Sequence, residues 1–174
     1  MMSAVSPQST GAGLNDQTPE LAAADLNRRT ILVADDRHDD FELLRLMFKK
    51  SGILNPLQWV ESVRDAVRYL RGEGVYGDRD AYPFPTLLLL DLHLGDGSGF
   101  DVLRALHKQQ LRAPLAVVVL TGSDVSAITQ AYGLGAHSFL VKPLKFSEFE
   151  NMVNHVRGIK LTVTRSGRLL EVES

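Results

Sequence analysis

The segment "TLLLLDLHLGDGSG", residues 86–99, places an aspartate at the end of four consecutive leucines and continues into a glycine-rich stretch. An apolar run bounded this sharply predicts a β-strand that is covered on both faces. In open α/β sheets, ligands bind beyond the carboxyl ends of such strands. Asp91, which follows the leucines, is therefore the first candidate for a functional residue.

The composition excludes several classes of protein. The chain has 174 residues, enough for one domain with a proper core. Its 19 basic and 21 acidic residues give a net charge of −2, which does not favour a nucleic-acid or membrane surface. The absence of cysteine excludes disulfides, thiolate catalysis and cysteine-ligated zinc. Because no segment approaches the ~20 apolar residues of a membrane span and the N-terminus does not read as a signal peptide, we expect a cytoplasmic protein.

The chain divides into three parts by composition. Residues 1–27 are rich in Ser, Ala, Gly, Gln and Pro, which predicts a flexible N-terminal tail. Residues 28–158 form the folded domain. Residues 159–174 are a C-terminal extension in which two β-prone runs flank Ser166–Gly167. This extension is either a β-hairpin, which would have to pack on the domain or serve as a dimer arm, or a frayed tail.

Apolar runs alternate regularly with amphipathic segments in residues 28–158. The expected strands are residues 30–36, 57–62, 86–92, 114–123 and 138–143, and the expected helices begin near residues 39, 63, 99, 124 and 147. Residues 72–85 are expected to form a long loop. Five strands that are each followed by a helix predict a flavodoxin-like (βα)5 fold, a doubly wound parallel sheet with strand order 2-1-3-4-5.

Polar residues follow four of these strands where they end, namely Asp35, Asp36, Asp91, Thr121 and Lys142. Taken singly, each has an ordinary structural explanation as a helix cap, a turn residue or a surface lysine. Together they meet at one rim of the sheet, where three carboxylates require a cation and oxygen ligands suit Mg²⁺. The lysine and the hydroxyl would complete a site for a phosphoryl group, with a carboxylate as nucleophile.

Four motifs extend this pattern: "ILVADD" (31–36), "LLLLDLHLGDGSGFDVL" (87–103), "VVVLTGS" (117–123) and "GAHSFLVKP" (135–143). With them, the chain from about Thr30 to Gly158 resembles the receiver domain of two-component response regulators. The segments "GILNPLQWV" (52–60) and "YLRGEGVYGDRDAYPFP" (69–85) are similar to those of stand-alone, phytochrome-associated response regulators.

The resemblance implies a role for each motif residue. Asp91 would be the phosphoacceptor, and Mg²⁺, with Mn²⁺ as a substitute, would be bound by Asp36, Asp91 and the backbone carbonyl of His93, with Asp35 acting through metal-bound water. Thr121 would be the switch hydroxyl and Lys142 the phosphate-binding lysine. Phe139 would be the switch aromatic residue, and the Lys142–Pro143 peptide bond would be cis. Four positions would tune the reaction: His93, Gly95, Gly122 and Ser123. Gly95 departs from the proline that is usual in the family, and glycine there gives a more flexible loop.

The function that the resemblance implies is signalling rather than catalysis. The chain would accept a phosphoryl group from a sensor histidine kinase or a histidine phosphotransfer protein, and would signal by protein contact through its fourth helix, fifth strand and fifth helix. Pairing of two copies is a further expectation. A phosphatase of the haloacid dehalogenase type is excluded because it needs a second aspartate at the position of His93. A degenerate receiver that binds partners without being phosphorylated remains an alternative.

Overall fold

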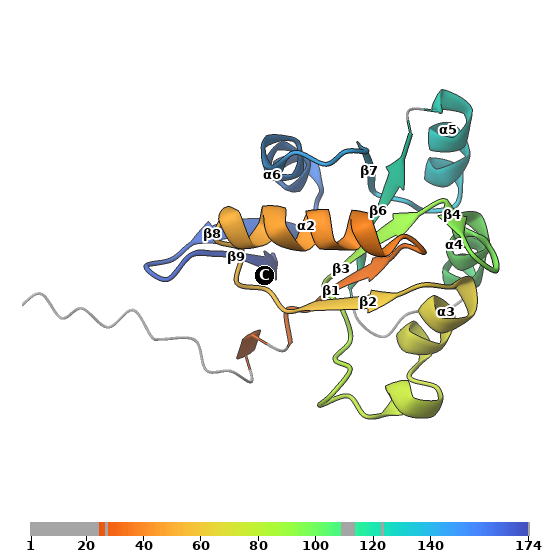
Figure 1. Ribbon diagram of the computed structural model, residues 1–174, viewed down its shortest axis with the longest axis horizontal. Coiled ribbons are helices and arrows are strands. Elements are labelled where there is room, and N and C mark those ends of the chain that lie inside the picture. The colour runs from red at the N-terminus through yellow and green to blue at the C-terminus, as the bar shows by residue number, and fades with distance from the viewer. Residues whose placement is uncertain (1–24, 27, 109–113, 123, 174) are drawn as a thin grey trace, which may run out of the picture.

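The computed structural model describes residues 25–26, 28–108, 114–122 and 124–173 (Figure 1). The expected N-terminal tail therefore lies almost entirely outside the described residues, as does Ser123. No helix of the described part is both long and apolar enough to cross a membrane.

Five parallel strands form the central sheet in the order β2-β1-β3-β6-β7, which confirms the predicted flavodoxin-like topology. The strands are β1 (Ile31–Ala34), β2 (Leu57–Val60), β3 (Leu87–Asp91), β6 (Ala116–Thr121) and β7 (Ser138–Val141). The helices are α2 (His38–Lys50), α3 (Val63–Arg71), α4 (Gly99–His107), α5 (Val125–Gly133) and α6 (Phe146–His155). The smaller elements are a 3-10 helix η1 (Gly74–Gly77), β4 (His93–Leu94), β5 (Gly97–Ser98), β8 (Ile159–Val163) and β9 (Arg168–Val172).

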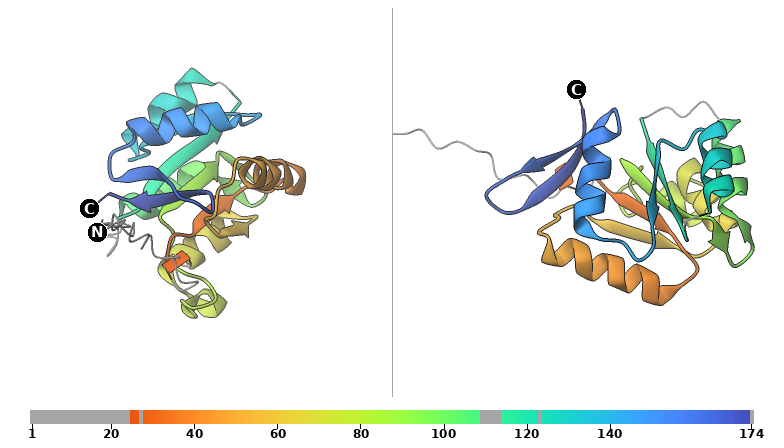
Figure 2. Two further views of the ribbon diagram at one scale, coloured as in Figure 1. Left: turned by 90° about the vertical axis from the view of Figure 1, so that its left-hand side faces the viewer. Right: turned by 90° about the horizontal axis from the view of Figure 1, so that it is seen from above.

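Strand β3 is apolar throughout because its leucines are buried on both faces of the sheet. Leu88 and Leu90 belong to a buried cluster with residues of α3 and α4, whereas Leu87 and Leu89 belong to a second cluster with residues of α2 and α6. Figure 2 shows the sheet between these two helical layers. Burying each leucine contributes about 1.5–3 kcal/mol, so β3 is fixed from both sides up to Asp91.

The C-terminal extension folds back on its own chain. Strands β8 and β9 pair antiparallel, and Ile159 and Leu170 enter the buried cluster that contains Phe48 and Phe149. The buried side chain of Asn55 donates to the carbonyl of Leu170 at 2.7 Å and accepts from the backbone N–H of the same residue at 2.7 Å. Of the two structures that the sequence left open for this extension, the molecule has the hairpin.

The hairpin carries a charged network that should make the stability of the protein depend on pH. The hydroxyl of Thr162 donates to Glu171 at 2.7 Å, and Arg29 and Lys160 pair with the same carboxylate. The hydrogen bond from Thr162 and these cations lower the pKa of Glu171 below its ordinary value of 4.5. A carboxylate with a lowered pKa stabilises the folded state above its unfolded pKa, and this contribution is lost as the pH falls through the folded pKa.

We therefore expect Glu171→Gln to lower the free energy of unfolding by about 1 kcal/mol at neutral pH. The difference from the wild type should shrink as the pH falls below about 4.5. Urea unfolding at a series of pH values measures it, with exposed Glu61→Gln as the control. A difference that does not change with pH would contradict the assigned role of this carboxylate.

Candidate functional site

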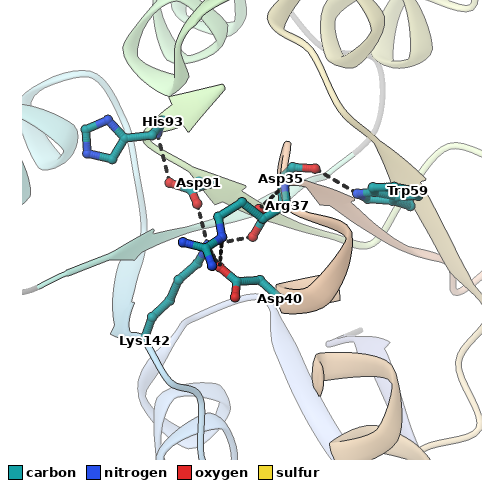
Figure 3. Close-up of polar contacts among 7 residues, drawn as sticks. All are labelled: Asp35, Arg37, Asp40, Trp59, Asp91, His93 and Lys142. Atoms are coloured by element: carbon teal, nitrogen blue, oxygen red, sulfur yellow. Dashed lines mark hydrogen bonds and ion pairs between the residues drawn. The ribbon is translucent and has the colours of Figure 1, made fainter. Parts of the chain in front are cut away.

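The carboxyl ends of three strands bring Asp35, Asp91 and Lys142 together (Figure 3). Asp35 follows β1, Asp91 ends β3 and Lys142 follows β7. The Lys142 ammonium donates to Asp35 Oδ2 at 2.6 Å and to Asp91 Oδ2. In a parallel sheet these ends share one edge, which is where the sequence placed the candidate site.

Backbone N–H groups fix the two carboxylates from the opposite side. The N–H of Arg37 donates to Asp35 Oδ1 at 2.9 Å, and the N–H of His93 donates to Asp91 Oδ1 at 2.8 Å. Each carboxylate therefore has one oxygen held by the loop that follows its strand and one oxygen on Lys142. The indole N–H of Trp59 on β2 also donates to the backbone carbonyl of Asp35 at 2.8 Å.

A third carboxylate, Asp40, completes the cluster and was missed by the sequence analysis. It lies in the first turn of α2, and its Oδ2 atom is 2.9 Å from the Lys142 ammonium. The sequence held a signal for it. Asp40 precedes buried Leu44 by four residues, so it lies on the helix face that packs against the sheet. Acidic residues in a first turn are also common because they favour the helix dipole, and this obscured the signal.

Two of the three carboxylates in the cluster are buried, and the cluster carries more negative than positive charge. The side chains of Asp35 and Asp91 are only 2% and 9% exposed. Burial raises the pKa of Asp35 above its ordinary value, against the opposing effect of its hydrogen bonds from Lys142 and Arg37. Burial alone would lower the pKa of Lys142, but its hydrogen bonds to the three carboxylates outweigh burial and raise that pKa.

The donor set fits a small divalent cation. Asp35, Asp40 and Asp91 each offer one carboxylate oxygen, and these oxygens lie within 4.8 Å of one another. Hard oxygen ligands at such separations suit Mg²⁺ or Mn²⁺. Asp36 is exposed and is not in this group, but its Oδ2 atom lies 3.8 Å from the point that a Cβ atom on Gly95 would occupy. It therefore faces the loop that follows β3.

That loop is held in place despite its glycines. Strands β4 and β5 pair antiparallel across it. The Asp96 carboxylate accepts from the backbone N–H groups of Val63 and Arg64, at 2.6 and 3.2 Å, and so anchors the loop on the first turn of α3. A Cβ atom on Gly95 would make only ordinary contacts, so nothing steric demands glycine there.

The structure also locates the other predicted residues that it describes. Thr121 is buried at the end of β6, and its carbonyl accepts from the backbone N–H of Lys142 at 2.9 Å. Phe139 on β7 is half-buried and meets Tyr132 edge to face, with ring centroids 6.3 Å apart. The Lys142–Pro143 peptide bond is cis. Gly122 and His93 are exposed.

A largely apolar pocket adjoins the cluster between α2 and the segment that follows β7. The cluster residues Asp35, Asp40 and Lys142 form its polar end, and the apolar lining is Val33, Leu43, Leu44, Leu120, Pro143 and Leu144. Leu43 is 61% exposed, so the apolar lining continues onto the surface of α2. A partner docked here would reach the carboxylates and the lysine.

Comparison with known proteins agrees with this geometry. The response regulator receiver domain family matches residues 31–154. The chain is 30% identical over 138 residues to the probable methanogenesis regulatory protein FilR2 of Methanothrix harundinacea, covering 78% of this chain and 86% of that protein.

Three solved structures are similar. The response regulator RPA3017 in red light signalling of R. palustris is 32% identical, with a TM-score of 0.63 over 70% of this chain and 85% of that one. The bacteriophytochrome response regulator RtBRR is 31% identical, with a TM-score of 0.67 over 79% and 82%. The Mn²⁺-bound response regulator Rcp1 is 28% identical, with a TM-score of 0.59 over 71% and 88%.

Receiver-domain response regulators are signalling proteins of two-component systems rather than enzymes, and they interact with histidine kinases, phosphotransfer proteins and other proteins. The strand order, the acidic cluster with its lysine and the match over most of the chain lead to one assignment. This protein belongs to the response regulator receiver domain family.

Proposed function

We propose that this protein is a response regulator whose Asp91 accepts a phosphoryl group from a phosphohistidine. The donor would be a sensor histidine kinase or a histidine phosphotransfer protein. The observation that carries the proposal is the Lys142 ammonium, which is shared by Asp91 and two further carboxylates at the carboxyl edge of the sheet. Such a site offers a nucleophile, a cation for phosphoryl oxygens and ligands for a metal.

In the reaction, a carboxylate oxygen of Asp91 bonds to phosphorus while the P–N bond of the phosphohistidine breaks. The imidazole leaves with the bonding electrons. The His93 N–H holds the Asp91 carboxylate in one orientation, and Lys142 neutralises charge on the transferred group. Asp36, Asp91 and the His93 carbonyl would hold Mg²⁺, or Mn²⁺ in its place, with Asp35 reached through water, and the ion would neutralise further charge when bound.

The product would switch the surface around α5, β7 and α6. An aspartyl phosphate carries about −1.5 to −2 charge, if it titrates like other phosphorylated side chains. Two charge-assisted hydrogen bonds, from Thr121 and Lys142, would contribute about 1.5–3 kcal/mol each. Reversing a 1:99 equilibrium takes about 5.5 kcal/mol, so these bonds support a large shift in which Phe139 turns inward.

The similar proteins suggest where to look for the donor. RPA3017 is described in red light signalling and RtBRR as a bacteriophytochrome response regulator, so bacteriophytochrome kinases are the first donors to test. Mn²⁺ in the Rcp1 structure supports the proposed metal. A kinase helix could dock in the apolar pocket beside Lys142, with its phosphohistidine directed at Asp91. We place this protein in the cytoplasm, together with its phosphohistidine donor.

The test is intact mass after incubation with Mg²⁺ and a small acyl-phosphate donor. We expect one added phosphoryl group in the wild type and none in Asp91→Asn or in the presence of a chelator. If neither the small donor nor a panel of phosphorylated kinases adds a phosphoryl group, the proposal is wrong. The chain would then be a receiver fold that binds partners without phosphorylation.

Self-association is a separate prediction. The hairpin of β8 and β9 packs on its own chain and leaves Val163 75% exposed near its tip. Equilibrium ultracentrifugation with and without a phosphoryl mimic would measure whether two copies pair. A monomer under both conditions would exclude the homodimer.

A further inference from the structure

The three hydrogens of the Lys142 ammonium have three different carboxylate partners. Nζ donates to Asp35 and Asp40 at 2.6 and 2.9 Å, and also to Asp91 (Figure 3). A lysine has no further donor to offer. Lys142 can therefore contact an oxygen of a phosphoryl group only after it has released one of these carboxylates.

Two of the three partners have other tasks in the proposed reaction. Asp91 forms the bond to phosphorus, and Asp35 serves the divalent cation. A cation that approaches these two carboxylates also repels the ammonium group that now contacts them. Both partners therefore become poorer anchors for Lys142 in the state that reacts.

Asp40 is positioned to keep its contact with Lys142 in the state that reacts. It lies on α2 rather than on a strand end, so it approaches Lys142 from the helical layer. Its side chain is 25% exposed, which makes its charge less costly to retain than that of Asp35. Arg37 Nε lies 3.6 Å from the same Oδ2 atom, so a second cation helps to orient this carboxylate.

We propose that Asp40 is a positioning residue that retains Lys142 beside the phosphoacceptor when Asp35 and Asp91 are engaged. The inference rests on the proposed function for its part in phosphorylation. Without the Asp40 charge, Lys142 depends on Asp35 and Asp91 alone. It then competes with the divalent cation for their oxygens and is held away from the phosphoryl group.

The test compares Asp40→Asn with Asp39→Asn. Both variants remove one negative charge from the first turn of α2, but Asp39 is exposed and outside the carboxylate cluster. We expect Asp40→Asn to weaken Mg²⁺ binding about fivefold and to slow phosphorylation at saturating Mg²⁺ about fivefold, whereas Asp39→Asn changes each less than twofold. Asp40→Glu, which restores the charge, should recover at least half of the rate.

A measurement on the metal-free protein separates this inference from the proposed function. The NMR signal of the Lys142 ammonium should be visible in the wild type, because its hydrogens are held. It should be broader in Asp40→Asn, where only Asp35 and Asp91 remain as charged partners, and unchanged in Asp39→Asn. If this pattern appears but the wild type is never phosphorylated, the proposed function fails and the anchoring stands. If phosphorylation is normal and the two Asn variants behave alike in rate, Mg²⁺ binding and NMR signal, the positioning role is wrong.

Discussion

Replacing Lys142 with Met is expected to lower the free energy of unfolding of the metal-free protein by about 3 kcal/mol at neutral pH. The ammonium is the shared partner of Asp35, Asp40 and Asp91. Removing one member of a buried ion pair leaves an uncompensated charge, which is more costly than the pair itself. The carboxylate of Asp35 would be destabilised most, because its side chain is 2% exposed. Its Oδ1 atom would still accept from the N–H of Arg37, but its Oδ2 atom would lose the Lys142 ammonium.

The loss should grow with pH. Burial already raises the pKa of Asp35 in the folded wild type above the ordinary 3.8, and without the ammonium that pKa must rise further. A carboxyl group with a raised folded pKa binds its proton more tightly in the folded state. Its contribution to stability is therefore largest at low pH and is lost as the pH rises from about the unfolded value through the folded pKa. The free energy of unfolding of the variant should approach that of the wild type below about pH 4 and become lower than it towards pH 7.

The measurement is urea unfolding at several pH values, with and without Mg²⁺. Lys145→Met is the matched control, because it removes the same charge from a side chain that is 71% exposed and whose salt bridge, to Glu148, is 3.5 Å long. Mg²⁺ should restore part of the lost stability, since a ligand that binds only the folded state stabilises it. If Lys142→Met unfolds as easily as Lys145→Met at every pH, the ammonium does not hold the cluster together.

The central sheet could be predicted because its signal is local. Four leucines before Asp91 leave no polar face, and such a strand must be covered on both sides. Strand order then followed from the number of strands and the right-handed crossover connections, and it brought Asp35, Asp91 and Lys142 to one edge.

Contacts that depend on distant segments could not be predicted in the same way. Asn55 binds the backbone of Leu170, 115 residues along the chain, and no local pattern in either segment points to the other. The sequence therefore favoured neither the hairpin nor the frayed tail as the structure of the C-terminal extension. The meeting of Asp40 with Lys142 likewise depends on where α2 starts relative to β1, which side-chain spacing alone does not give.

Gly99→Ala is expected to destabilise the protein by about 3 kcal/mol and to slow phosphorylation at least tenfold. Gly99 is the first residue of α4 and is buried against the end of β3. A Cβ atom there would lie closer to the Asp91 carbonyl oxygen than real Cβ atoms come to any neighbour, and 3.0 Å from the Cα atom of Leu92. Both neighbours are backbone atoms, so no side chain can rotate away to relieve the contact.

The steric clash should also slow phosphorylation, because the backbone that it displaces is that of the phosphoacceptor Asp91. Moving the Asp91 backbone changes the distance of its carboxylate from Lys142 and from the N–H of His93, and small displacements of a reacting group have large effects on rate. Gly133→Ala in α5 is the matched control, since a Cβ atom there meets nothing within 4 Å. It should leave the rate unchanged and stabilise the protein by at most about 1 kcal/mol. If Gly99→Ala matches this control in stability and rate, the end of β3 is more pliable than its packing indicates, and Asp91 is not held rigidly by it.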